Sequence, residues 1–165
     1  MNSLHESLFI SIFALLYALL EIEIEGDAGW GKNLPTPKIL FEFTQYHIIM
    51  ILMISLIIFK IYYKSKTNLL FTIFVLSLWF ILEDTYWFIF NKHYTLKKYN
   101  KENVPWHRWF LGLPYGSWIS ITIIIFCYLN SKDNNIISIV TYTMLISIFY
   151  IIIAPLYHEF YNKYH

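Results

Sequence analysis

Five apolar stretches of about 20 residues, separated by polar segments, run through this sequence and limit the folds open to it. A hydrocarbon core roughly 30 Å thick is crossed by about 20 residues of α-helix, so each stretch is long enough to span a bilayer. Because a spanning segment must satisfy its own backbone hydrogen bonds, we expect helices. The sequence therefore predicts an all-α integral membrane protein, a single domain built as a bundle of about five transmembrane helices. The expected crossings lie at residues 4–24, 43–63, 69–90, 110–129 and 136–157.

The composition agrees with a bilayer as the solvent. Hydrophobic residues make up 58% of the 165 residues and charged residues 14%, which is too little polar surface to cover a soluble domain of this size. A formal net charge of +1 gives no reason to expect nucleic acid, so membrane lipids are the expected partners. The single cysteine, Cys127, excludes an intramolecular disulfide and a cysteine metal cluster.

Three of the windows contain residues that are unusual for a regular transmembrane helix or that decide whether the window is a signal peptide. Gly112 and Pro114 lie in the fourth window, whose first turns we expect to be irregular or kinked, and Pro155 lies near the end of the fifth. The first window carries Glu6 where a signal peptide would have a basic stretch, so we expect this window to remain as a crossing.

Lysine and arginine predict the orientation in the membrane. With five crossings, the loops at 26–42 and 91–109 share one side of the bilayer with the carboxyl terminus, and this side carries eight of the 12 basic residues. Loops rich in lysine and arginine remain in the cytoplasm. We therefore expect the amino terminus outside the cell and the carboxyl terminus in the cytoplasm.

Acidic residues on the same side lie inside the apolar windows or at their borders. The apolar run of the first window, residues 8–20, is only 13 residues long, so the required span draws Glu21 into the bilayer. Six further residues of the third window follow Glu83 and Asp84, which places this pair about 9 Å below the surface. A charge in hydrocarbon costs on the order of 2.5–3.5 kcal/mol, so such residues usually face a protein interior and have a function.

Histidines expected near the same interface complete a candidate site of carboxylates and imidazoles. Such donors suit Zn, Mn or Fe, and helical bundles commonly build metal sites from inward-facing Glu and His. The residues expected to ligate a divalent metal are Glu21, Glu25, His47, Glu83 and His158. The residues expected to act in catalysis are Glu83, Asp84 and His107. The residues expected to bind substrate are Arg108, Trp87 and Trp106.

The spacing of these residues leaves a structural interpretation open. No His-x-x-His, Glu-x-x-His or His-Glu-x-x-His element occurs in the sequence. In the structural interpretation, Glu83 pairs with Arg108 or a lysine and fastens the 91–109 loop to the bundle, and His107 between two tryptophans is an interfacial anchor. The aromatic residues of the third window, Trp79 among them, would then contact lipid or pack in the bundle.

Three functions are compatible with this pattern. The leading hypothesis is a membrane-embedded enzyme that acts on a lipid or other hydrophobic substrate at the cytoplasmic interface, and that is metal-dependent if the predicted ligands bind a divalent ion. The second is a proton- or ion-coupled transporter in which Glu83 and Asp84 relay protons, although the sequence has no internal repeat. The third is a non-catalytic subunit or scaffold of a membrane complex. Nucleophilic catalysis fits poorly, because no Gly-x-Ser-x-Gly element occurs and Cys127 lies midway along a crossing.

Three blocks of residues also carry a resemblance. They are EIEIEG (21–26) with GW (29–30) and LPT (34–36), then ED (83–84) with WF (87–88) and Asn91, then NVPWH (103–107). In this order they resemble a group of small uncharacterised multi-pass membrane proteins of bacteria and archaea. The resemblance covers roughly residues 21–118. It implies no activity, but it coincides with the polar cluster that the crossings predict.

Overall fold

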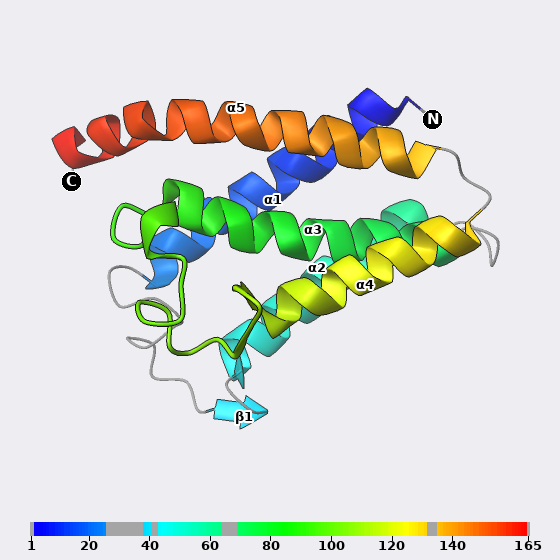
Figure 1. The fold of residues 1–165 in the computed structure, drawn as a ribbon, viewed down its shortest axis with the longest axis horizontal. Coiled ribbons are helices and arrows are strands. Elements are labelled where there is room, and N and C mark those ends of the chain that lie inside the picture. Colours follow the sequence, from blue (N-terminus) through cyan, green and yellow to red (C-terminus); the bar gives the residue numbers. More distant parts are fainter. Residues whose placement is uncertain (1, 26–37, 41–42, 64–68, 132–134, 165) are drawn as a thin grey trace.

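The computed structural model describes residues 2–25, 38–40, 43–63, 69–131 and 135–164. In these ranges the chain forms a bundle of five α-helices, four of them long and apolar enough to cross a membrane (Figure 1). The fifth, α4, is apolar but shorter, with 16 residues. The predicted all-α membrane bundle is confirmed. The helices are α1 (Ser3–Glu25), α2 (Gln45–Tyr62), α3 (Leu69–Phe90), α4 (Tyr115–Asn130) and α5 (Asn135–Tyr164).

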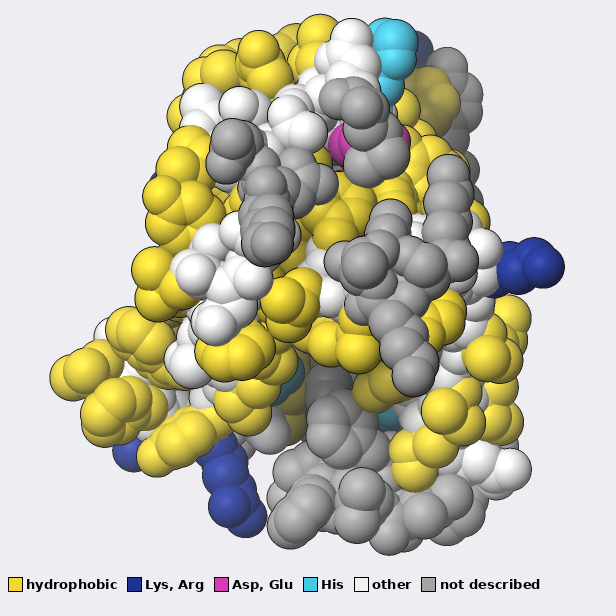
Figure 2. Space-filling view, turned by 90° about the vertical axis from the view of Figure 1, so that its right-hand side faces the viewer, with side chains coloured by type: hydrophobic (Ala, Val, Ile, Leu, Met, Phe, Trp, Pro, Cys, Tyr) yellow, Lys and Arg dark blue, Asp and Glu magenta, His cyan; other side chains and the backbone are white. Residues whose placement is uncertain are grey.

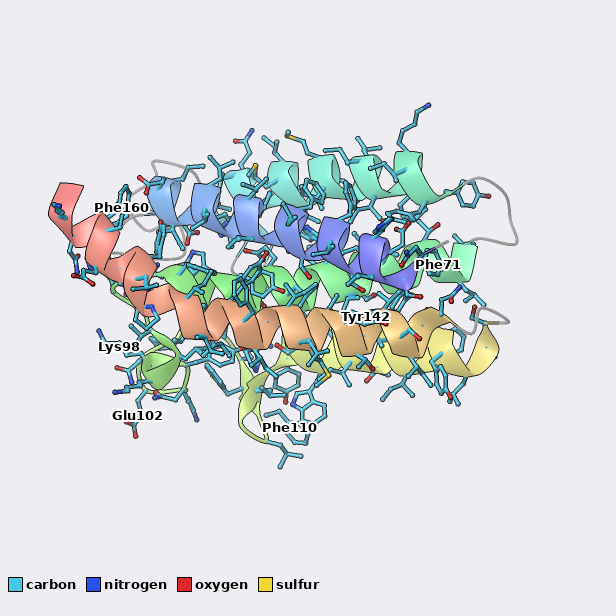
Figure 3. All side chains as sticks on the ribbon, turned by 90° about the horizontal axis from the view of Figure 1, so that it is seen from above. Phe71, Lys98, Glu102, Phe110, Tyr142 and Phe160 are labelled. Carbon is cyan, nitrogen blue, oxygen red and sulfur yellow. The ribbon has the colours of Figure 1, made fainter. Side chains whose placement is uncertain are left out.

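A β-hairpin stands where the first turns of the fourth crossing are expected. Leu111 and Gly112 have positive φ angles of 44° and 81°, and a helix cannot include two such residues in succession. They form the two-residue turn of the hairpin, so the helix begins only at Tyr115. Figure 3 shows Phe110 of this hairpin projecting away from the bundle. The short elements outside the α-helices are β1 (Lys38–Leu40), β2 (Phe43–Thr44), the 3-10 helix η2 (Leu96–Lys98), β3 (Trp109–Phe110) and β4 (Leu113–Pro114).

Helix α3 occupies the centre of the bundle and contacts each of the other four helices. In Figure 1, α5 lies above α3 and α4 below it, while α1 begins beside α5 and passes behind α3. The largest fully buried side chains include Trp79, Tyr86 and Phe74, all of which belong to α3. A helix that is apolar on all sides is expected in this position, because every face of it meets another helix.

The outer faces of the helices carry large exposed hydrophobic side chains. Examples are Leu56 of α2, Leu129 of α4 and Ile152 of α5, which are 70%, 72% and 68% exposed. Figure 2, which looks onto one end of the bundle, shows hydrophobic side chains over much of the surface that the described residues form. Exposed apolar surface of this extent is unfavourable in water, whereas acyl chains cover it in a bilayer. The protein is therefore an integral membrane protein.

Side-chain hydrogen bonds link α2 to α1. The packing between these two helices is sparse, and α2 makes most of its helix contacts with α3. At one end of the bundle, the Tyr62 hydroxyl donates to Oε2 of Glu6 at 2.6 Å. At the other end, the Tyr46 hydroxyl donates to Oε1 of Glu21 at 3.3 Å. Polar contacts thus attach α2 to α1 near both membrane surfaces.

We predict that Tyr62→Phe destabilises the protein, whereas Tyr63→Phe does not. Tyr62 is buried and its hydroxyl donates to a carboxylate, and a hydrogen bond to a charged group contributes about 1.5–3 kcal/mol. Tyr63 is the matched control because this residue is 42% exposed. Thermal unfolding of the purified protein in detergent, followed by intrinsic fluorescence, measures both effects. Equal melting temperatures for wild type and Tyr62→Phe would contradict the role assigned to this hydrogen bond.

Candidate functional site

Two carboxyl groups from different helices are in direct contact inside the bundle. Glu83 lies seven residues before the end of α3, and only 8% of its surface is exposed. Its side chain is hydrogen-bonded to that of Glu21, which lies four residues before the end of α1. Two carboxyl groups bond each other only when one of them holds a proton, since an ionised carboxylate has no hydrogen to donate. The pair lies inside the bundle, roughly 10 Å from the end of α3.

One helical turn beyond Glu21, Glu25 contacts an imidazole of α2. Its Oε1 atom lies 3.5 Å from Nε2 of His47, and both side chains are buried. Nδ1 of the same imidazole lies 2.8 Å from Oγ1 of Thr44, the residue that precedes α2. The first turn of α2 thus supplies His47 to Glu25 and Tyr46 to Glu21. These contacts fix the orientation of the Glu21 and Glu25 side chains.

Asp84 faces a different part of the site from Glu83. Successive residues of a helix are about 100° apart, so the two acids of α3 point in different directions. The charge of Asp84 acts on His107, which belongs to the loop between α3 and α4. Burial lowers the pKa of His107 below its ordinary value, while Asp84 and Glu25 act in the opposite direction. His107 therefore stays neutral at pH values where a free histidine begins to charge.

The loop that carries His107 is built as an ordered cap on this end of the bundle. Oδ1 of the buried Asn91 accepts hydrogen bonds from the backbone N–H groups of His93 and Tyr94 at 2.8 and 3.1 Å. Val104 is fully buried, and its carbonyl oxygen accepts a 2.9 Å hydrogen bond from Nε1 of Trp109. A polar loop of this length needs such internal bonds to place a side chain at the site.

Tyr99 joins the cap to both neighbouring helices. Its ring packs on Phe88 of α3 and Trp109, with centroids 4.4 and 5.2 Å away. Its hydroxyl is hydrogen-bonded to Ser117 of α4. Burial raises the pKa of Tyr99 to about 12, so the phenol remains neutral at any physiological pH. The cap is thus attached to the bundle by aromatic packing together with a neutral hydrogen bond.

These groups surround a cavity of about 360 Å³ between α1, α2, α3, α4 and the cap. Its size lies within the range of small-molecule pockets, which begins at roughly 300 Å³. The walls are mostly apolar and aromatic, and the described lining residues include no lysine or arginine. The ionisable residues in the lining, apart from the tyrosine Tyr17, are Glu21, Glu25, His47, Glu83, Asp84 and His107.

The structure brings together most, but not all, of the residues expected at the site. Trp87 and Trp106 line the cavity beside the four acids and the two histidines named above. His158 does not, because it lies on α5, where its Nε2 atom is 3.1 Å from the carbonyl oxygen of Phe90. Arg108 is exposed and lies outside the lining. Their predicted roles as a metal ligand and a substrate contact gain no support from these positions.

The expected metal site has no ligand set in the described part of the chain. Within those residues, no group of three or more His, Cys, Asp or Glu side chains could hold a metal ion. The predicted Zn, Mn or Fe ligands are dispersed around the cavity, and His158 lies outside it. A metal at this site stays a prediction.

The structural interpretation, in which Glu83 pairs with Arg108 or a lysine, has no support in the described residues. No arginine or lysine of these segments pairs with Glu83, whose hydrogen-bond partner is Glu21. A different component of the site was missed from the sequence. Trp79 was assigned to lipid contact or packing, but it lines the cavity and is 1% exposed. Its spacing four residues before Glu83 places both on one helix face, and this signal could have identified it.

No protein-family model, curated protein or solved structure matches this chain. The resemblance of its three sequence blocks to small bacterial and archaeal membrane proteins therefore stays a prediction. The function has to be inferred from the geometry of the cavity and from the chemistry of its lining.

We predict that His107 makes the protein less stable as the pH falls. A base whose pKa is lower in the folded state binds fewer protons there than in the unfolded chain. The free energy of unfolding should therefore decrease as the pH falls through the unfolded pKa of about 6.5, by at most about 1.4 kcal/mol per pH unit. Thermal unfolding between about pH 8 and about pH 5 measures this decrease.

The test compares wild type with His107→Gln, which has no imidazole to protonate. The variant should lose less stability than wild type over this pH range. His93→Gln removes a histidine from the same loop but outside the cavity lining, so it should retain the His107 contribution. Parallel stability curves for wild type and His107→Gln would show that burial of His107 does not influence stability.

Proposed function

We propose that this protein is a membrane-embedded enzyme that transfers protons to and from an amphiphilic, lipid-like substrate at one membrane interface. The observation that carries the proposal is the hydrogen-bonded pair of Glu21 and Glu83 inside a cavity of about 360 Å³. Buried ionisable residues inside a membrane protein usually have a function, because their insertion is costly.

The chemistry of the pair supports acid–base catalysis. Of two carboxyl groups that share one proton, the protonated one can act as a general acid and the ionised one as a general base. Tyr46 donates a hydrogen bond to Glu21, and this bond favours the ionised form of that group. We therefore assign the acid role to Glu83 and the base role to Glu21. Asp84 and His107 form a second set of proton-binding groups across the cavity.

The surroundings of the pair support a substrate that is partly apolar. Aliphatic and aromatic side chains, including Ile51, Ile81 and Phe88, line the same cavity as the acids. Its volume accommodates a headgroup and the first carbons of a chain, but not a complete lipid. Acyl chains and polar headgroups meet at this depth of the membrane.

The proposal does not require a metal ion. The proton chemistry described above uses only side chains that line the cavity. A reaction that depends on Zn, Mn or Fe would need ligands in addition to the dispersed set found among the described residues. Inhibition by a chelator, reversed by one of these metals, would argue for the metal-dependent form of the enzyme.

We propose that the cavity lies at the cytoplasmic interface, with the amino terminus outside and the carboxyl terminus inside. Lysine and arginine support this orientation, because the cap between α3 and α4 carries Lys92, Lys97, Lys98, Lys101 and Arg108. The cap lies at the cavity end of the bundle, as do the carboxyl-terminal end of α1 and the first turn of α2.

The first experiment compares membrane lipids from cells that express wild type, Glu83→Gln or neither. We expect at least one lipid species to change in amount with wild type, and this change to fall at least about tenfold with Glu83→Gln, since an amide cannot transfer the proton. Untargeted mass spectrometry of the extracted lipids measures the change. The variants are used at equal amounts in the membrane.

Glu21→Gln and Glu23→Gln provide a matched pair for this experiment. Both lie on α1 two residues apart, but Glu23 is exposed and lies outside the cavity lining. Glu21→Gln should lose the lipid change, and Glu23→Gln should retain it. Identical lipid profiles for wild type, Glu83→Gln and cells without the protein would overturn the proposed enzyme.

The orientation is tested with single cysteines introduced at exposed positions. Asn2→Cys should react with a membrane-impermeant maleimide on intact cells, whereas Glu102→Cys should react only after permeabilisation. The native Cys127 is fully buried in α4, so it contributes little background. Labelling of Glu102→Cys on intact cells would reverse the assignment.

A further inference from the structure

The tip of the β3–β4 hairpin has a backbone conformation that its side chain does not favour. Leu111 and Gly112 have φ angles of 44° and 81°, and positive values at both positions are those of a type I′ turn. Such turns prefer Asn-Gly, because a bulky side chain at positive φ is crowded by its own backbone. Leu111 is also 76% exposed, the highest value among the large hydrophobic residues that the structure describes. Packing within the protein therefore does not explain why an apolar side chain occupies this strained position.

The hairpin projects to the side of the bundle, across the direction of the helices. In Figure 3 the helices run roughly from left to right, and the labelled Phe110 lies beside the bundle, between its two ends. The cavity gives the level of the hairpin, because Pro114 of β4 lines it together with Glu83, which lies roughly 10 Å before the end of α3. A segment that points sideways from a membrane bundle at this level meets lipid.

Aromatic side chains of α4 support the hairpin. Phe110 is 51% exposed, and its ring centroid lies 5.9 Å from that of Tyr115 and 6.3 Å from that of Trp118. Nε1 of Trp118 donates a 2.7 Å hydrogen bond to the carbonyl oxygen of Phe110. The backbone N–H of Tyr115 donates to the carbonyl oxygen of Arg108 at 2.9 Å. Because tyrosine and tryptophan rings favour the boundary between headgroups and acyl chains, the hairpin is suited to this boundary.

Positive charge lies at the base of the hairpin. Arg108 directly precedes β3 and is exposed. The segment 91–109, which forms the cap, contains five basic residues and one acidic residue. A basic residue near the membrane surface strengthens the binding of anionic lipid roughly fivefold, and the planar guanidinium group of arginine matches two phosphate oxygens. An anionic lipid is thus the partner whose charge complements this part of the protein.

We propose that the β3–β4 hairpin is a lateral membrane anchor that binds an anionic phospholipid. Leu111 and Phe110 lie among the upper acyl carbons, Tyr115 and Trp118 lie at the level of the glycerol, and Arg108 contacts the headgroup phosphate. Contact with acyl chains offsets the strain at Leu111, because it buries an apolar side chain that is exposed on the protein. The inference is independent of the proposed enzyme, since none of these five residues lines the cavity.

Quenching of a fluorophore at the tip of the hairpin tests insertion. Leu111→Cys and Glu102→Cys are each labelled with bimane in the full-length protein and reconstituted into phosphatidylcholine vesicles. Glu102 is an exposed residue of the same loop, and the native Cys127 is fully buried. We expect lipid with a doxyl group on a shallow acyl carbon to quench the probe at position 111, and iodide in the water to quench only the probe at position 102.

The same probe at position 111 measures the headgroup preference. Phosphatidylglycerol and phosphatidylcholine with the doxyl group on the same acyl carbon are compared at equal amounts in the vesicles. We expect phosphatidylglycerol to be preferred roughly fivefold next to the probe, and Arg108→Gln to remove most of this preference. Lys60→Gln removes an exposed basic residue from the last turn of α2, at the other end of the bundle, so it should retain the preference.

Leu111→Asn separates a role in lipid contact from a role in protein packing. Asparagine is favoured at this position of the turn, so the melting temperature of the variant in detergent should equal or exceed that of wild type. Added phosphatidylglycerol should then stabilise wild type more than Leu111→Asn. A clear loss of stability in detergent alone would show that Leu111 packs against protein, and it would overturn the anchor.

The remaining outcomes identify what covers the hairpin if the proposal is wrong. Quenching of the probe at position 111 by iodide would place the hairpin in water. Protection of this probe from both doxyl lipid and iodide would indicate a protein partner, such as a second copy of the chain. Equal quenching by the two headgroups would remove the anionic phospholipid. Each of these three results overturns the proposal.

Discussion

The pair of Glu21 and Glu83 determines how the rest of the bundle can be arranged. A carboxylate exposed to acyl chains would be costly to insert, so both acids must face protein and must lie opposite each other. This requirement places α1 directly against α3, with the carboxyl-terminal turns of both helices at the same end of the bundle. Helix α3 is then enclosed by its neighbours, and its polar residues lie in an interior that the bilayer does not reach. The two acids therefore lie in a protein interior, which avoids the cost of placing them among acyl chains.

The surroundings of this pair are supplied by segments that are distant in the sequence. The first turn of α2 provides Tyr46 and His47, and the cap between α3 and α4 provides Trp106 and His107. Each group is oriented by a second contact, such as the bond between Thr44 and His47. Side chains held in this way lose little conformational freedom when a ligand binds, which favours both recognition and proton transfer.

The sequence predicts the helices well because length and hydropathy are sufficient to identify a membrane span. It also predicts that acids of the first and third spans share one membrane face with histidines, since alternate crossings fix which ends lie together. It cannot predict rotation about a helix axis, and this decides that Glu83 meets Glu21 while Asp84 faces His107. The hairpin before α4 depends on backbone angles at Leu111 that a hydropathy window does not register. His158 occurs at the expected end of the bundle, but α5 turns it toward Phe90.

Helices α2 and α4, which both line the cavity, are short for membrane spans. At 1.5 Å per residue, the 18 residues of α2 reach roughly 27 Å and the 16 residues of α4 roughly 24 Å, whereas the hydrocarbon layer is about 30 Å thick. Helix α5, on the opposite side of α3, has 30 residues. A bilayer adapts to a short hydrophobic wall by thinning beside it. We therefore expect the bilayer to be thinner beside α2 and α4 than beside α5.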